Sequence, residues 1–198
     1  MSEIPGEQAA QSINRCFEQW GLPKCIKIDN GLPLALPAQR DIPTLTELWW
    51  VGLGIEVLHN KPACPQQNGT VEGLQGVCFR WAEPARCALP QDLQQTLEAN
   101  NFFQRENYKV PAKKKQTRRQ LYPDLWERVR PFGPDSFQFE RVQAFLSTKV
   151  WQREIKKSGS IKLFNTEIFI SQARKMIGVN VSVTYDKEEN IYFITAIR

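Results

Sequence analysis

The chain has 198 residues, enough for one medium domain or a truncated domain with a small one, and its 41% apolar and 11% aromatic content is typical of folded proteins. No apolar run reaches the ~18 to 20 residues that span a bilayer, and Glu3 and Glu7 stand where a secretory signal would be basic, so we expect a cytoplasmic protein without a membrane partner. The net charge of +5 is uneven: residues 1–100 hold 7 basic and 11 acidic residues, and residues 101–198 hold 19 and 10, which favours a polyanion such as nucleic acid as partner, with a basic solvated surface as the alternative.

The first predicted elements are a helix and a short strand. Residues 7–20 carry apolar side chains at the spacing of an amphipathic helix, which Gly21 ends. Residues 25–28 are rich in β-branched side chains and predict a core strand that stops at Asp29-Asn30-Gly31. This strand places Asp29 at its C-terminal end, and a proline-rich loop over residues 32–41 follows.

A second helix and strand lead to a polar loop. Residues 44–53 place their apolar side chains on one helical face, and residues 55–58 predict a strand. The loop that follows ends at Asn68, which can cap a helix beginning at Gly69 or Thr70.

The middle of the chain is helical and then basic. Residues 69–103 have a helical pattern that is interrupted at Pro84 and restarts at Pro90, where proline fits a first turn. Residues 108–134 are polar and lack a clear period, so we expect a linker. Its basic cluster comprises Lys113, Lys114, Lys115, Arg118 and Arg119.

The last segment changes to short runs of β-branched and aromatic residues separated by turn residues. These runs predict five strands that form a small SH3-like β-barrel. The predicted strands are residues 153–158, 161–164, 167–170, 179–185 and 191–197.

The cysteines are odd in number and show no CxxC pair, so they fit neither a secreted disulfide scaffold nor a common zinc motif. We expect reduced thiols that are buried or partly buried, with a zinc site that includes His59 as the weaker alternative. The five residues are Cys16, Cys25, Cys64, Cys78 and Cys87.

Two acidic motifs carry the functional signal, and each alone has a structural explanation. Asp29-Asn30-Gly31 is a composition that any tight turn after a strand uses. Glu72 ends the run Pro65-Gln66-Gln67-Asn68-Gly69-Thr70-Val71-Glu72, and a glutamate in a first helical turn complements the helix dipole.

In this order, with Leu53-Gly54-Ile55 between them and 42 residues separating Asp29 from Glu72, the motifs resemble the catalytic core of DDE transposases and retroviral-type integrases. The resemblance is good over residues 21–80 and looser elsewhere. It implies an α/β fold: a truncated RNase H-like (integrase core) domain over residues 1–107, a basic linker with helical pieces over 108–150, and a small β-barrel over 151–198.

In that family three carboxylates hold two divalent metal ions, Mg²⁺ or Mn²⁺, which suit hard oxygen ligands and phosphodiester chemistry. By resemblance, Asp29 is the second carboxylate and Glu72 the third. The first aspartate belongs to an upstream strand, and only Glu3, Glu7 and Glu18 precede Asp29 as acids. We therefore expect weak or absent metal binding and no strand transfer by this chain alone.

The resemblance also implies DNA contacts. The barrel resembles the small β-barrel of phage Mu-type transposases, where it helps bind DNA; here the alternatives are a solvated barrel surface and, for the basic cluster, a soluble tether. Two glycines, Gly73 and Gly76, weaken the helix that carries Glu72. The candidate DNA-binding residues are Asn68, Arg80, Lys113, Lys114, Lys115, Arg118, Arg119, Lys156, Lys157 and Lys162, with Arg174 and Lys175 as further barrel cations.

Three hypotheses about function remain. The chain is a degraded or split DDE transposase, a DNA-binding or transposase-interacting regulatory module, or an inert product that does not fold stably. The expected partners are DNA, as mobile-element ends and target, and a second copy or a full-length transposase. A DNA-bound form would be nucleoid-associated.

Overall fold

The computed structural model describes most of the chain and divides it into two compact units. The first unit comprises Met1–Asn14, Pro23–His59 and Gly133–Arg198, and the second comprises Arg15–Leu22 and Asn60–Phe132. The three-domain division expected from the sequence stays a prediction. The described residues are 6–29, 31, 34, 41–61, 64–123, 130–164, 166–171 and 176–197.

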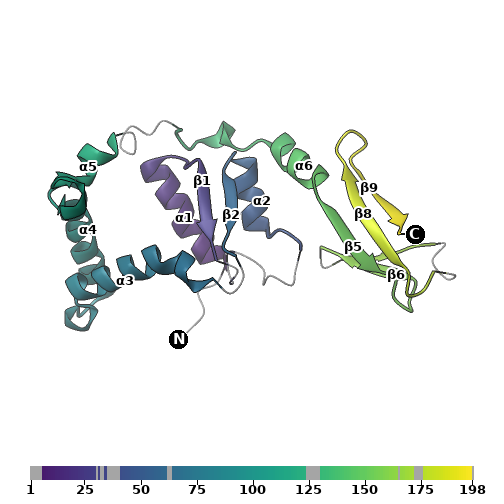
Figure 1. Cartoon of the computed structure of the whole chain (residues 1–198), viewed down its shortest axis with the longest axis horizontal. Coiled ribbons are helices and arrows are strands. Elements are labelled where there is room, and N and C mark those ends of the chain that lie inside the picture. Colours follow the sequence, from purple (N-terminus) through teal and green to yellow (C-terminus); the bar gives the residue numbers. More distant parts are fainter. Residues whose placement is uncertain are drawn as a thin grey trace. The chain divides into compact units, whose positions relative to one another are not determined.

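The chain mixes helices with small sheets, as the α/β class requires (Figure 1). The helices are α1 (Gly6–Trp20), α2 (Leu45–Gly52), α3 (Gly69–Ala82), α4 (Pro90–Glu106), α5 (Arg118–Leu121) and α6 (Phe139–Ser147). The strands are β1 (Cys25–Ile28), β2 (Glu56–His59), β3 (Lys109–Val110), β4 (Gln116–Thr117), β5 (Val150–Glu154), β6 (Ser160–Leu163), β7 (Thr166–Phe169), β8 (Asn180–Asp186) and β9 (Ile191–Ala196).

In the first unit, β1 and β2 form a parallel pair, visible side by side in Figure 1. Cys25 is opposite Glu56 and Ile28 is opposite His59, so the carboxyl ends of both strands lie at one edge. The predicted strand β1 is confirmed with its bounds, and β2 begins one residue later than predicted. Ile28 is buried, which fixes the strand that leads to Asp29.

Helix α2 is fixed by its N-terminus and by a close approach at its C-terminus. The Thr44 hydroxyl accepts a hydrogen bond from Glu47 N, and the Glu47 carboxylate accepts one from Thr44 N, a reciprocal capping box. At the other end, Gly52 O accepts a hydrogen bond from Gln138 N at 2.9 Å. A Cβ at Gly52 would lie 2.1 Å from the Phe137 ring, so glycine permits this approach.

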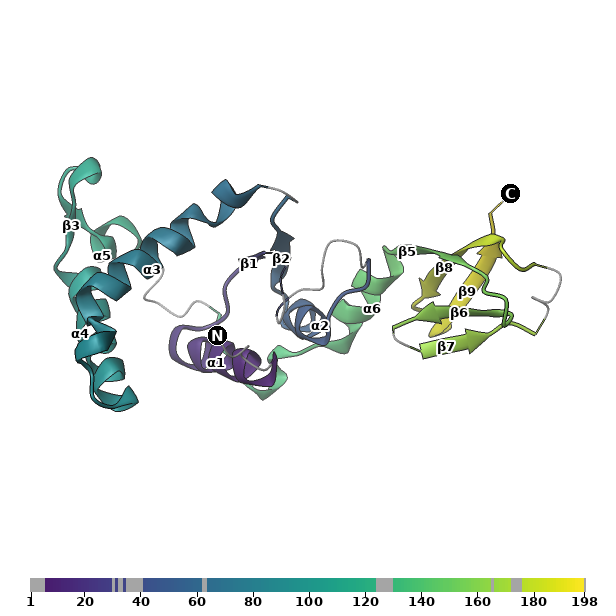
Figure 2. The same cartoon turned by 90° about the horizontal axis from the view of Figure 1, so that it is seen from below.

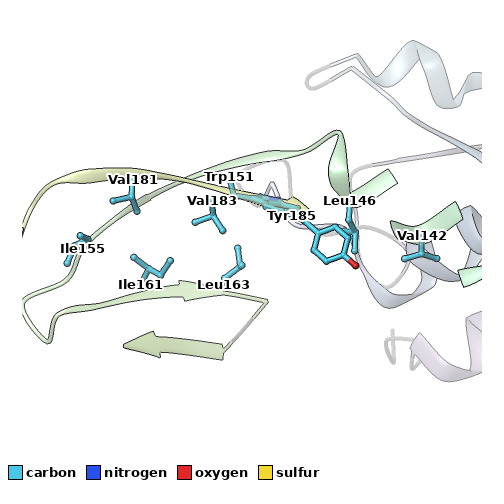
Figure 3. Close-up of a cluster of buried hydrophobic side chains, with 9 residues drawn as sticks. All are labelled: Val142, Leu146, Trp151, Ile155, Ile161, Leu163, Val181, Val183 and Tyr185. Atoms are coloured by element: carbon cyan, nitrogen blue, oxygen red, sulfur yellow. The ribbon is translucent and has the colours of Figure 1, made fainter. Parts of the chain in front are cut away.

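The C-terminal strands enclose the main core of the first unit. They form an antiparallel sheet in the order β5-β8-β9 and a separate β6-β7 hairpin. Figure 3 shows Val181 and Val183 of β8 facing Ile161 and Leu163 of β6. The presence of five strands is confirmed, whereas the SH3-like topology stays a prediction.

The first of these strands was predicted at the wrong place. β5 ends at Glu154, whereas a strand over residues 153–158 had been expected. Ile155 is still buried, but the chain then turns at Gly159, whose φ is +76° and whose N–H donates to Lys156 O. The strand extends in the other direction because Trp151 is buried in the core.

The second unit contains α3, α4 and a short hairpin. Glu83 adopts a left-handed conformation with φ of +40° and ends α3 before Pro84, as the sequence indicated. The predicted linker holds more structure than expected, because β3 pairs with β4 and α5 follows at once (Figure 2). Within the described ranges, no helix has both the length and the apolar character needed to cross a membrane.

The cysteines are all unpaired. Cys64, Cys78 and Cys87 are partly buried, as expected. The expected burial is wrong for Cys16 and Cys25, because both lie on solvent-facing positions of α1 and β1.

Candidate functional site

Asp29 stands in the first unit, directly after the buried end of β1. Its side chain is exposed, and its Oδ1 accepts a hydrogen bond from Gly31 N at 3.3 Å. The aspartate therefore shapes the local turn and still presents a carboxylate to solvent. Asn30, which was expected to help form this turn, lies outside the described residues.

Glu72 stands in the second unit, in the first turn of α3, and its side chain is exposed. A short 3-10 helix, η1 (Pro65–Asn68), leads directly into α3. The dipole of α3 gives its N-terminal end a partial positive charge that favours a carboxylate. Since Asp29 and Glu72 belong to different units, their meeting at one metal site stays a prediction.

Helix α3 begins at Gly69 with Asn68 at its N-cap position, as predicted, but the expected capping by the Asn68 side chain is wrong. The Asn68 backbone is in the right-handed helical region, and its side chain makes no capping hydrogen bond. Two local contacts explain this: the Asn68 Oδ1 accepts from Asn60 Nδ2, and the η1 turns run into α3 without an extended residue between them. The side chain oxygen that would cap the helix is thus already engaged.

The sequence also missed the polar contacts that hold η1. Asn60 is 8% exposed, and the Gln67 Oε1 accepts a hydrogen bond from Lys61 N at 3.1 Å. The available signal was the polar pair Asn60-Lys61 immediately after a strand. These contacts hold η1, which leads into the helix that carries Glu72.

The described residues contain no group of three or more His, Cys, Asp or Glu side chains placed to share a metal ion, and the expected weak or absent metal binding stays a prediction. Exposed carboxylates such as Asp29 and Glu72 are suitable oxygen ligands for Mg²⁺. These two candidates alone are fewer than the three carboxylates that hold two ions in the family that the sequence resembles. His59 and Glu47 form a 2.7 Å pair in the first unit, with Glu47 only 6% exposed.

The predicted basic cluster separates into two kinds of residue. Arg118 Nη1 donates to the backbone oxygen of Gln104 at 2.9 Å and to its side-chain oxygen at 2.8 Å, and the guanidinium lies 5.2 Å from the centre of the Tyr108 ring. Arg119 pairs with Glu106 at 3.1 Å. Both arginines bind α4 or the residues just after it.

The three lysines of the cluster point to solvent. Lys113, Lys114 and Lys115 are exposed, and they show no ionic partner among the described residues. They occupy the connection between β3 and β4, where Lys113 ends the short 3-10 helix η3 (Pro111–Lys113). The division between anchored arginines and presented lysines was not visible in the sequence.

The remaining candidate cations are exposed but not equivalent. Arg80 lies on α3, and Lys157 lies in the turn after β5. Lys156 lies 3.5 Å from Glu167, and Lys162 is opposite Glu167 in the β6-β7 register. The hydrogen bond from Ser160, with the charge of Lys156, lowers the pKa of Glu167. The negative charge of the ionised Glu167 carboxylate offsets part of this basic surface. Arg174 and Lys175 lie outside the described residues.

No family model matches the chain. Among solved structures, the chain is similar to one chain of the cryo-EM structure of the simian T-cell lymphotropic virus intasome in complex with PP2A regulatory subunit B56 gamma. The TM-score is 0.48 and the identity 14%, over 99% of this chain and 63% of that one. The chain thus spans under two thirds of the length of its match. A likeness of this degree establishes neither a common fold nor a common function.

Proposed function

We propose that the chain is an integrase-related protein of DNA transposition and integration that is catalytically incomplete by itself. The observation that carries this proposal is the ordered pair of motifs in their local settings. Asp29 follows the buried end of the parallel strand β1, and Glu72 lies in the first turn of α3, after η1 (Pro65–Asn68). Both carboxylates are exposed, so each is accessible to a metal ion as an oxygen ligand.

The incompleteness rests on the acids that precede Asp29. Glu7 and Glu18 lie exposed on α1, and no strand precedes β1 in the described part of the chain. In this proposal the third carboxylate is supplied by a separate fragment. With it, Asp29 and Glu72 are the proposed ligands for Mg²⁺ or Mn²⁺, and such ions supply activation of the attacking oxygen and stabilisation of the leaving one.

A strand-transfer assay tests the proposal. Labelled donor ends and supercoiled target DNA are incubated with Mg²⁺ or Mn²⁺ and the chain, with and without a fragment carrying a strand-borne aspartate. We expect no product from the chain alone and product with the fragment. Asp29→Asn and Glu72→Gln each abolish that product, whereas the exposed control Glu98→Gln leaves it unchanged. Product that survives both substitutions contradicts the assigned carboxylates.

A second function, DNA binding or association with a transposase without chemistry, is favoured by the exposed lysines between β3 and β4. Under this function, binding of duplex DNA in a gel-shift assay survives Asp29→Ala and Glu72→Ala. Absence of product in every reconstitution, together with binding that both variants retain, selects this function over the split enzyme. An inert product is selected only by absence of both binding and cooperative unfolding.

A further inference from the structure

We propose that Lys113, Lys114 and Lys115 form a preordered surface for the phosphates of double-stranded DNA, and that Arg118 and Arg119 are positioning residues that hold this surface in place. The three lysines are called the lysine loop below. The choice of DNA as the polyanion rests on the proposed function. The assignment of separate roles to lysines and arginines rests on contacts within the second unit.

The lysine loop is anchored on both sides. β3 and β4 pair in antiparallel register, with Lys109 opposite Thr117 and Val110 opposite Gln116. Directly after β4, Thr117 caps α5: its hydroxyl accepts from Gln120 N, and the Gln120 side chain accepts from Thr117 N. The loop therefore leaves and re-enters a closed hairpin.

Two arginine contacts attach this hairpin to α4. Arg118 donates two hydrogen bonds to Gln104, the stronger kind because the donor is charged, and covers one face of Tyr108. Arg119 is paired with Glu106, whose side chain is 20% exposed. Guanidinium groups that are held through Nη1 in this way contribute order to the hairpin, whereas the lysines have no such contact among the described residues.

The backbone of the lysine loop is unfavourable for lysine. Lys114 and Lys115 have φ of +51° and +56°, a region that glycine adopts readily and side chains with a Cβ disfavour. Three adjacent ammonium groups also repel one another, and no acid among the described residues pairs with them. The loop thus combines an unfavourable backbone conformation with repulsion between its ammonium groups. This combination at an exposed site indicates a partner that binds both the backbone shape of the loop and its positive charge.

The chemistry of the loop favours duplex phosphates over single-stranded bases. Lysine binds phosphate as a flexible point charge, without the planar fork that reads a guanine edge. Single-strand binding sites rely on aromatic side chains that stack with bases. The aromatic ring closest to the loop in the sequence, Tyr108, already stacks with Arg118. We therefore expect backbone contact that does not depend on DNA sequence.

The test measures how binding of a short duplex depends on salt, using the full chain and fluorescence anisotropy from 50 to 300 mM salt. Each lost phosphate contact reduces the slope of log K against log salt by about 0.9. Lys114→Gln/Lys115→Gln should reduce the slope by about 1.8 and weaken binding by roughly tenfold or more at low salt. The matched control is Lys24→Gln/Lys187→Gln, which removes the same charge from exposed sites in the first unit. It should leave the slope close to that of the unmodified chain.

Positioning by the arginines has a different signature. Arg118→Lys keeps the charge but loses the two-bond contact and the stacking, so binding should weaken severalfold with an unchanged slope. The same measurement on Arg119→Lys should show the same pattern. A slope reduced by about 0.9 in either variant would mean that the arginine itself contacts a phosphate, which overturns its positioning role.

The outcomes separate this inference from the proposed function. Duplex binding with equal slopes for the lysine double variant and its control overturns the inference and leaves the proposed function standing. Tighter binding to single-stranded DNA, duplex RNA or phosphatidylserine vesicles than to duplex DNA, lost in the lysine variant, overturns the choice of partner. Strand transfer in the reconstituted assay that is unaffected by the lysine variant, with duplex binding also unaffected, sinks the inference alone.

Discussion

At the scale of single residues, Asp41 connects the segment before α2 to strand β5. Its carboxylate accepts hydrogen bonds from both terminal nitrogens of Arg153, at 2.9 and 2.7 Å, and its backbone oxygen accepts from Trp151 Nε1 at 3.1 Å. The hydrogen bonds and charge of Arg153 lower the pKa of Asp41 below its ordinary value, against a smaller opposing effect of burial. One residue thus joins two segments that are more than a hundred positions apart.

This pair predicts a pH-dependent contribution to stability. A carboxyl whose pKa is lowered by folding stabilises the protein fully above its unfolded pKa of ~3.9 and loses that contribution as pH falls through the folded pKa. Asp41→Asn should therefore lower the free energy of unfolding at pH 7, by less than ~1 kcal/mol because the Asp41 side chain is 52% exposed. The difference should shrink below about pH 4.

Urea unfolding at pH 7, 5 and 3 measures this effect. The control is the same substitution in an Arg153→Gln background, where the pH dependence should largely disappear because the partner charge is gone. A stability difference that stays constant from pH 7 to pH 3 would show that the Asp41 charge is not the cause.

The lysine loop allows a residue-scale prediction that separates folding from binding. Lys114→Gly and Lys115→Gly remove a side chain from a left-handed backbone, so each should raise the free energy of unfolding by about 1 kcal/mol. Lys113→Gly is the matched control, because Lys113 lies in η3 and glycine there should destabilise by ~0.5 to 1 kcal/mol. Guanidinium denaturation measures the free energy of unfolding of the three variants. A loss of stability in all three would contradict a strained loop.

At the scale of elements, local patterns predicted what local forces determine. The β-branched run of β1 and the apolar face of α2 are complete within a few residues, and both elements lie where the sequence indicated, although the Thr44-Glu47 capping box was not predicted. The start of β5 depends instead on Trp151, whose ring packs against Phe164 and Tyr192 and whose N–H reaches Asp41. No window around residue 151 contains those partners, so the strand was placed too late.

The same distinction holds for the candidate site. The strand end at Asp29 and the first turn at Glu72 follow from neighbouring residues, and the structure describes both as predicted locally. The engagement of Asn68 by Asn60 and of Arg118 by Gln104 depends on side chains 8 and 14 positions away. A composition-based assignment gave all five cluster cations one role, because only tertiary contacts distinguish Arg118 and Arg119 from the lysines.

Three helical glycines give a prediction at this scale. In α2, a Cβ at Gly52 would meet the Phe137 ring, which is itself stacked on Trp49 at 4.9 Å and cannot move freely. Gly52→Ala should therefore destabilise the protein by ~1 to 3 kcal/mol. In α3, nothing lies within 4 Å of a Cβ at Gly73 or Gly76.

Gly73→Ala and Gly76→Ala serve as matched controls, because each places the same methyl group in a helix interior without a neighbour. Each should stabilise by ~0.5 to 1 kcal/mol through helix propensity alone. Thermal unfolding monitored by circular dichroism compares the three variants. A neutral Gly52→Ala would mean that the Phe137 ring can leave its stacked position at little cost.

At the scale of the whole molecule, burial is divided unevenly between the two units. In the first unit, Trp50, Leu53 and Trp151 are at most 1% exposed, and β6 and β8 contribute four more buried aliphatic side chains. In the second unit, the buried apolar side chains among the described residues are Phe17, Leu22 and Ala82. Helices α3 and α4 expose large apolar side chains instead, namely Val71, Leu74, Phe79, Trp81, Phe102 and Phe103.

This distribution predicts two levels of local stability in one chain. Amide groups exchange hydrogen through local opening where few apolar contacts oppose it, and through global unfolding where the core is well packed. Amides of β8, which carries the buried Val181 and Val183, should therefore exchange at least a hundredfold more slowly than those of α4. Hydrogen-exchange mass spectrometry of the full chain at neutral pH measures both in one sample.

The dependence of exchange on urea distinguishes local opening of α4 from an intrinsic difference in exchange rate between helices and strands. In low urea, exchange of β8 should accelerate with the slope of global unfolding, whereas exchange of α4 should depend weakly on urea, because its opening exposes little new surface. Equal protection of α4 and β8, with a common urea dependence, would mean that both units unfold as one cooperative body. The exposed apolar side chains of α3 and α4 would then be compatible with full stability of the chain alone.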